Sequence, residues 1–314
     1  MKIIFSLCLI LGFLVSPVWA ADSPAPKVVV SIKPLHSLVA GVMQGVGEPL
    51  LLVKGGGSPH GYVLRPSEAQ ALAKAQLVVW VGHELESFLE KPLSTLGHKA
   101  QQLELSEQLA DLLLAKRKGG IWEKPEHQHH SKEEHAGNDT QRQKNADLHL
   151  WLDPVLAKQI VSLAGKALAE IDPTHRSLYQ ANTTVMIEKL DRLNRTLEKK
   201  LEPVKDIPYI VFHAAYQYFE AAYGLNAVGS ITIDPERRPG AKRMLQIRQK
   251  IKQLNARCVF SEPQFESRLV ATVIEGTGAK TGILDPLGAD LQSGTEAYFQ
   301  LMTRLGDNLY EGLK

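Results

Sequence analysis

The stretch Asp172–Pro203, DPTHRSLYQANTTVMIEKLDRLNRTLEKKLEP, decides the architecture of this chain. Asp172 is a cap-like residue, Pro173 suits a first helical position, and no Gly or other Pro follows before Pro203. One long helix over residues 172–203 is therefore predicted, with a length on the order of 40 Å at ~1.5 Å per residue. A helix of that length reaches from one domain to another, and we interpret it as a link between two lobes.

The predicted helix carries an apolar stripe at helical spacing, which indicates a packing surface and no chemistry. Its members are Leu178, Val185, Met186, Leu190, Leu193, Leu197 and Leu201.

Short β-branched runs recur on both sides of this helix, and turn residues and a helical pattern follow each run. The predicted strands are Val28–Ser31, Leu50–Val53, Leu77–Val81 and His149–Leu152 before the helix, and Tyr209–Phe212, Ala227–Ile231, Cys258–Phe260 and Gly282–Leu284 after it. Between two of them, Ser67 and Gln70 form a capping-box pattern that opens a helix through Lys74. The alternation predicts an α/β protein with mostly parallel strands. We expect two lobes, each a sheet flanked by helices, over residues 27–171 and 207–314, joined by the helix 172–203.

The N-terminus predicts export. Lys2, the apolar run Ile3–Val15 and the small residues that end at Ala21 are typical of a secretory signal peptide of residues 1–20, cut after Ala20. No later segment is long and apolar enough to span a membrane, so a soluble, exported mature protein is expected. Cys258 is then the only cysteine, and its apolar neighbours indicate a buried structural thiol.

The charge balance argues against one class of partner. The full chain has 36 Lys and Arg against 34 Asp and Glu, and removal of residues 1–20 takes away one lysine and no acid, which leaves 35 against 34. A nearly neutral chain does not have the basic surface that nucleic-acid binding requires. We expect no nucleic-acid partner and a monomer.

Polar side chains gather where the predicted strands end. His60 follows the second strand after a Gly-rich turn, His149 lies in the fourth, and His213, Glu262 and Asp285 follow three strands of the second lobe. Ligands of parallel sheets bind beyond the carboxyl ends of strands. Each histidine alone also suits a turn cap, a buried strand or an aromatic cluster, but all three together at strand ends favour a metal site.

Three imidazoles suit Zn²⁺ better than Mn²⁺ or Mg²⁺, whose sites are dominated by oxygen. The predicted zinc ligands are His60, His149 and His213. Asp285 or water takes the fourth position, although Asp285 followed by Pro also suits a simple turn. Glu262 is a weaker candidate that instead stabilises the loop or orients a histidine.

A polar tract without periodicity runs from about Lys116 to Asn145 and contains His127, His129, His130 and His135. Short His-rich tracts are a metal-binding composition, and we expect a surface loop with auxiliary, weak metal binding. The alternative is a merely solvated loop, because Lys and Glu surround the histidines.

Six stretches carry a resemblance to a known family: Ser31–Pro34, Pro59–Ser67, His149–Leu152, Val211–Tyr216, Phe260–Phe265 and Leu284–Gly288. Over essentially the whole mature chain, the sequence resembles the periplasmic zinc-binding proteins that serve zinc-importing ABC transporters, within the larger group of metal-binding receptors with a rigid linking helix. The resemblance implies a metal held between two lobes by His60, His149 and His213, and a variable acidic, His-rich loop between the first two. Manganese-binding relatives tend to have a carboxylate at the place of His213, which favours zinc again.

The sequence departs from the family in two places. Pro59 stands where some zinc relatives carry a carboxylate, so the fourth ligand falls to Asp285 or water. Cys258 pairs in some relatives with a cysteine near the C-terminus, but residues 307–314 contain none, so packing must hold the last helix.

The resemblance implies a non-catalytic periplasmic receptor that captures Zn²⁺ and passes it to a membrane permease. A secreted zinc hydrolase that uses the same histidines, with Glu262 or Asp285 as base, is the alternative, and a zinc-buffering protein is a third possibility.

Overall fold

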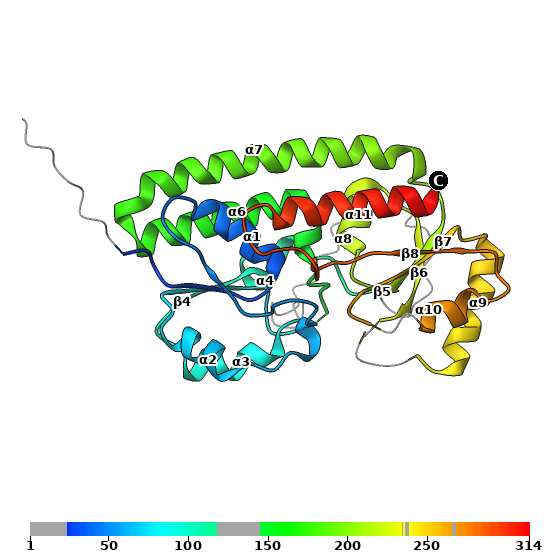
Figure 1. Ribbon diagram of the computed structural model, residues 1–314, viewed down its shortest axis with the longest axis horizontal. Coiled ribbons are helices and arrows are strands. Elements are labelled where there is room, and N and C mark those ends of the chain that lie inside the picture. Colours follow the sequence, from blue (N-terminus) through cyan, green and yellow to red (C-terminus); the bar gives the residue numbers. More distant parts are fainter. Residues whose placement is uncertain (1–23, 118–144, 234, 236–238, 266–267) are drawn as a thin grey trace, which may run out of the picture.

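The computed structural model of the chain describes residues 24–117, 145–233, 235, 239–265 and 268–314. Two four-stranded sheets lie toward the two ends of an elongated molecule, and long helices run along one side of both (Figure 1). The predicted α/β class with two lobes is confirmed. The signal peptide predicted for residues 1–20 lies outside the described residues.

The N-terminal sheet is built from short parallel strands in the order β2-β1-β3-β4. The strands are β1 (Val28–Val30), β2 (Leu50–Leu51), β3 (Leu77–Trp80) and β4 (Gln101–Glu104). All residues of β1 and β3 are buried, as expected for central strands of a parallel sheet that is covered on both faces. The order of the strands reverses between β1 and β3, and ligand sites of open α/β sheets lie at such a reversal.

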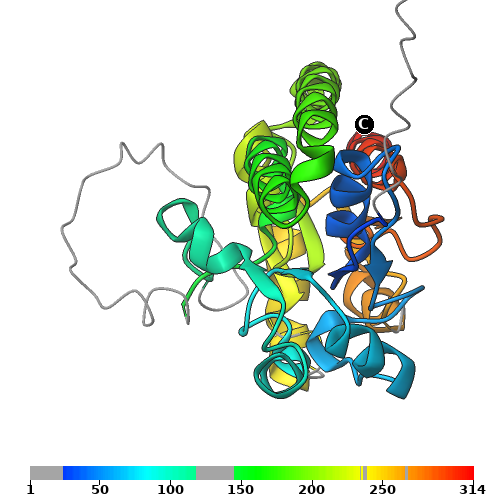
Figure 2. The ribbon, with the colours of Figure 1, turned by 90° about the vertical axis from the view of Figure 1, so that its left-hand side faces the viewer.

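Helices cover both faces of this sheet. Seen from its end, α6 and the linking helix α7 (Arg176–Leu201) lie beside α1 on one face, and α2 and α3 lie on the other (Figure 2). The elements of this lobe are α1 (Lys33–Val42), η1 (Pro59–Gly61), α2 (Pro66–Ala73), α3 (Ser87–Thr95), α4 (Leu105–Gln108), η2 (Ala110–Leu112), η3 (Leu150–Leu152) and α6 (Pro154–Ile171), where η denotes a 3-10 helix.

The C-terminal sheet repeats the architecture with the parallel order β6-β5-β7-β8. Its strands are β5 (Tyr209–His213), β6 (Ala227–Thr232), β7 (Cys258–Ser261) and β8 (Lys280–Ile283). Its helices are α8 (Gln217–Tyr223), α9 (Ala241–Leu254), α10 (Arg268–Ile274) and α11 (Ala297–Leu313). The strand order reverses between β5 and β7, which places the residues after these two strands at the expected ligand position.

The linking helix is present as α7 (Arg176–Leu201), between the short elements η4 (Pro173–His175) and η5 (Glu202–Val204). It begins later than predicted because Pro173 opens a separate 3-10 turn. Most of the predicted stripe is buried, but Leu178 and Val185 are 38% and 52% exposed. Tyr179, one residue further on, is fully buried instead, so the packing surface lies slightly around the helix from the predicted one.

One apolar core joins the lobes. A single cluster of buried side chains includes Val30 of β1, Leu190 of α7, Phe260 of β7 and Leu305 of α11. The last helix contributes much of it, because α11 packs against both α1 and α7 and runs alongside α7 (Figure 1). Within the described part of the chain, no helix combines the length and the apolar content needed to cross a membrane.

Three local predictions were wrong. Residues 150–152 form the 3-10 helix η3 and not a strand, because a short run that is buried on every side has no periodicity to distinguish the two. The edge strand β4 was missed, since only Leu103 of its four residues is buried. Helix α2 starts at Pro66, and the Glu68 carboxylate accepts the Arg65 backbone N–H at 2.8 Å, so the Ser67 and Gln70 capping box does not form.

Cys258 is a buried free thiol on β7, as predicted. Burial raises the pKa of this thiol to about 12, so it stays protonated and unreactive at neutral pH. The last helix passes close to it, and a Cβ on Gly312 of α11 would lie 3.2 Å from the Cys258 sulfur.

Candidate metal centre

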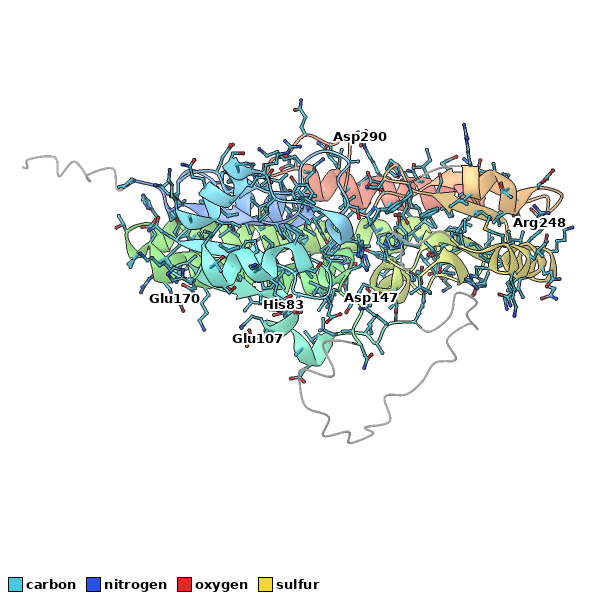
Figure 3. The ribbon with its side chains drawn as sticks, turned by 90° about the horizontal axis from the view of Figure 1, so that it is seen from below. His83, Glu107, Asp147, Glu170, Arg248 and Asp290 are labelled. Atoms are coloured by element: carbon cyan, nitrogen blue, oxygen red, sulfur yellow. The ribbon has the colours of Figure 1, made fainter. Side chains whose placement is uncertain are left out.

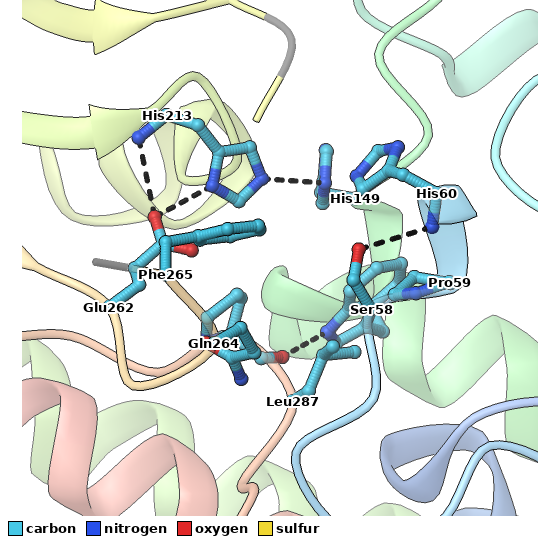
Figure 4. Close-up of a pocket in the computed structure, with 11 residues that line it drawn as sticks. Ser58, Pro59, His60, His149, His213, Glu262, Gln264, Phe265 and Leu287 are labelled. Atoms are coloured by element: carbon cyan, nitrogen blue, oxygen red, sulfur yellow. Dashed lines mark hydrogen bonds and ion pairs between the residues drawn. The ribbon is translucent and has the colours of Figure 1, made fainter. Parts of the chain in front are cut away.

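His213 is the last residue of β5 and points across the junction between the lobes (Figure 4). Its side chain is almost fully buried. Glu262, the residue after β7, accepts a hydrogen bond from His213 Nδ1 at 2.7 Å and lies 3.3 Å from its backbone nitrogen. The strand-order reversal brings these residues together, because β5 and β7 are neighbours in the sheet but are 45 residues or more apart in the chain. Glu262 therefore orients the histidine, one of the two roles expected for it.

His149 is held in the same way from the other lobe. It stands just before η3, and the Asp147 carboxylate lies 3.0 Å from its backbone nitrogen and 2.8 Å from its Nδ1. Both residues are buried. Sequence reasoning missed Asp147, although an aspartate two residues before a candidate ligand histidine is the signal that points to it.

His60 lies in η1, a 3-10 turn of the N-terminal lobe that starts with Pro59. Ser58 caps this turn, since its hydroxyl accepts the His60 backbone N–H at 3.3 Å. Burial, and then the nearby His149, His213 and Lys116, lower the pKa of His60 to about 2. The ring is thus neutral throughout the physiological range, which is the form that binds a metal.

The structure brings these three imidazoles into one group. One ring nitrogen from each of His60, His149 and His213 lies within 4.8 Å of the others, and the pairs of ring centroids are 5.2 to 5.8 Å apart. Among the described residues, this is the one group of three or more potential ligands gathered so closely.

The Nε2 atoms of His149 and His213 lie close together. His149 Nε2 and His213 Nε2 are 3.4 Å apart. Each ring donates its Nδ1 proton to a carboxylate, so in the neutral tautomers both Nε2 atoms carry a lone pair and have no proton to share. Two nitrogens bound to one tetrahedral zinc at ~2.0–2.1 Å are about 3.3 Å apart. The observed separation matches that of two ligands of one zinc ion.

Asp285 does not join this group. Its carboxylate accepts hydrogen bonds from the backbone N–H groups of Leu287, Gly288 and Ala289 and from Gln264 Nε2, with lengths of 2.5 to 3.0 Å. Both oxygens are thus engaged in the turn that follows β8, which is the structural role considered for this Asp-Pro sequence. The loop histidines His127, His129, His130 and His135 lie outside the described residues.

The turn after β8 forms one wall of the site. Pro286 and Leu287 line a small cavity of about 10 Å³ beside the three imidazoles. Trp151 lines it as well and donates a hydrogen bond from Nε1 to the Pro286 carbonyl at 2.8 Å. The side chains of this wall are apolar or, in Trp151, already engaged, so the wall supplies no ligand atom for a metal.

Lys33 of the N-terminal lobe fixes that wall. Its buried ammonium group donates to the backbone carbonyls of Gly288, Ala289 and Leu291, the last two at 3.0 and 2.7 Å. Burial lowers the pKa of Lys33, and the charges of Asp285 and Asp290 oppose this shift. The ammonium therefore joins α1 of one lobe to the turn of the other, next to the histidines.

Comparisons with known proteins agree on one family. Residues 28–312 match the family described as ZnuA, zinc-uptake complex component A, periplasmic. The high-affinity zinc uptake system protein ZnuA of Brucella abortus (strain 2308) is 46% identical over 304 residues, and the alignment covers 91% of each sequence. The protein of the same name from Yersinia pestis is 36% identical over 292 residues, again with 91% of each covered. A crystal structure of ZnuA superposes with a TM-score of 0.74 at 26% identity, over 92% of this chain and 100% of the other.

Proposed function

Because the chain belongs to the family of ZnuA, the periplasmic component of zinc-uptake complexes, we propose that it captures Zn²⁺ and delivers it to the membrane permease of an ABC transporter. In this proposal His60, His149 and His213 bind the ion at the junction of the lobes. The 3.4 Å separation of the two Nε2 atoms carries the assignment, because it matches the spacing of two nitrogen ligands on one tetrahedral zinc ion.

The site is preorganised on one side and adaptable on the other. Buried carboxylates orient His149 and His213 through their Nδ1 atoms, whereas the His60 ring has no hydrogen-bond partner among the described residues. Since one core joins the two lobes, we expect release by a local movement of the turn that carries His60 and not by a large closure of the lobes. Acidification weakens binding in this scheme, because protons compete with zinc for the imidazoles.

The fourth zinc position falls to a solvent molecule or another small ligand, since Asp285 is engaged in its own turn. We place the working protein in the periplasm as a monomer, after removal of residues 1–20, and we assign it no catalytic activity. The histidines of residues 116–145 supply at most auxiliary, weak binding. The hydrolase alternative finds no support, because the relatives are zinc uptake proteins.

A calorimetric zinc titration tests this assignment. Wild type should bind one Zn²⁺ tightly, and His213→Ala should bind it more than about 100-fold more weakly. Loss of a group that only supports a metal ligand costs at most about 100-fold in affinity, so a larger loss identifies a ligand. His98→Ala is the matched control, because His98 is an exposed histidine whose Nδ1 contacts only the Thr95 carbonyl among the described residues. Undiminished tight binding by His213→Ala would overturn the proposal.

A further inference from the structure

Two cavities of very different size border the group of imidazoles. The first is a small space of about 10 Å³ beside Trp151 and Leu287. The second, of about 380 Å³, opens on His60 and His149 from the other side. Asp147, which also lines it, lies near the middle of the molecule between the lobes (Figure 3).

Size decides which cavity receives a fourth ligand larger than water. A water molecule needs roughly 10–15 Å³ of such space, so the small cavity holds about one water and nothing larger. The larger cavity has room for an organic anion of several heavy atoms. A ligand that completes the zinc coordination from this side reaches His60 and His149 directly.

The larger cavity also has a cation whose donors are available. Lys116 lines it, and its ammonium group lies 3.9 Å from the nearest carboxylate oxygen of Glu84, which is too far for a hydrogen bond. Among the described residues Lys116 makes no side-chain hydrogen bond. Two of the other charged groups of the lining are engaged, since Arg117 pairs with Glu220 and Asp147 holds His149, while Glu84 faces Lys116 across 3.9 Å.

A lysine in this place opposes the capture of a bare cation. The imidazoles themselves are neutral, and the carboxylates of Asp147 and Glu262 stand behind the rings of His149 and His213, so the Lys116 ammonium group on the side of the larger cavity repels a bound Zn²⁺. The charge of Lys116 already acts on the His60 ring. An anionic fourth ligand offsets the repulsion between Lys116 and the metal, because the anion is attracted by both of them.

We propose that the fourth zinc ligand is the carboxylate of a small organic anion, which enters the larger cavity and is held there by Lys116. The inference rests on the proposed zinc site and adds the co-ligand to it. By thermodynamic linkage, such a carboxylate raises the affinity for the metal by the same factor by which the metal raises the affinity for the carboxylate.

Acetate is the probe for the experiment, and Co²⁺ replaces zinc as a spectroscopic reporter. The visible absorption of bound Co²⁺ changes when the fourth ligand changes, so acetate is titrated into the Co²⁺-loaded protein with perchlorate as the only other anion. Wild type should show a saturable spectral change. Lys116→Met should bind acetate weaker by roughly fivefold or more, the usual minimum for coupled sites. Lys158→Met is the control, since Lys158 pairs with Asp191 on the linking helix and should leave acetate binding unchanged.

Two results would overturn the inference: a cobalt spectrum that acetate does not alter, or equal acetate affinity in wild type and Lys116→Met. Metal loading is measured first, with His213→Ala as reference. Failure of loading contradicts the proposed function itself, whereas normal loading without an acetate effect contradicts only the co-ligand.

Discussion

The carboxylates behind the histidines should control zinc affinity without contact to the metal. We consider Asp147→Asn and Glu262→Gln, which keep the size of each side chain and remove its charge. In the structure these carboxylates stand 2.8 and 2.7 Å from the Nδ1 atoms of His149 and His213, and both are buried. Each substitution therefore replaces a charge-assisted hydrogen bond by a neutral one at a buried side chain.

The expected loss of zinc affinity follows from the weaker hydrogen bond to each histidine. Hydrogen bonds to charged groups contribute about 1.5–3 kcal/mol and neutral ones about 0.5–1.5 kcal/mol, so each variant loses on the order of 1–1.5 kcal/mol. Every 1.4 kcal/mol is a factor of ten in affinity, which gives about tenfold weaker zinc binding for each variant. If the two act independently, the double variant should be weaker by about 100-fold.

Competition with a fluorescent zinc chelator at neutral pH measures these affinities. The chain offers a matched control in Asp172→Asn, because buried Asp172 accepts a hydrogen bond from His175 Nδ1 at 2.7 Å but belongs to the turn before the linking helix. This control should bind zinc as tightly as wild type. A loss below about threefold in both single variants, or an equal loss in the control, would refute the orienting role.

Three further predictions concern stability and the wall of the site. Burial raises the pKa of Glu86 to about 7 from an ordinary 4.5. The contribution of Glu86 to folding stability is therefore complete below about pH 4.5 and is lost as the pH rises through 7. Glu86→Gln should raise the free energy of unfolding in urea at pH 8 by up to the order of 3 kcal/mol and change it little at pH 4. Lys33→Met leaves three carbonyls without their donor and should speed zinc dissociation in stopped-flow chelator competition, while Lys189→Met, at the more exposed pair with Glu296, should not. Gly312→Ala places a Cβ 2.7 Å from Phe260 and should cost about 1–3 kcal/mol in urea unfolding, whereas Gly240→Ala, with open space around it, should be nearly neutral.

The sequence predicts the parts of the fold and site that depend on local patterns. The linking helix is visible from the capping signals at Asp172 and Pro173, and His213 is found because β5 is a clear strand. His149 was grouped with His60 and His213, as the structure has it, for a partly wrong reason, since its segment forms a 3-10 helix and not a strand.

Other features depend on contacts between distant segments and leave little trace in the sequence. Lys33 reaches carbonyls more than 250 residues away, and no periodic pattern records such a partner. The engagement of Asp285 in its own turn and the place of the Lys116 ammonium group in the lining of the larger cavity likewise become visible only when backbone and side chains are placed in space.

The position of α11 has a consequence for how the protein reaches its folded state. Ser37 of α1 accepts the backbone N–H of Tyr298, 261 residues later, and Tyr298 is fully buried. The first lobe therefore cannot complete its core until the last helix has been synthesised and has packed against it. Contacts of such long sequence separation slow folding and leave apolar surface exposed in the meantime. We expect the chain to depend on periplasmic folding helpers during export and to tolerate C-terminal truncation poorly.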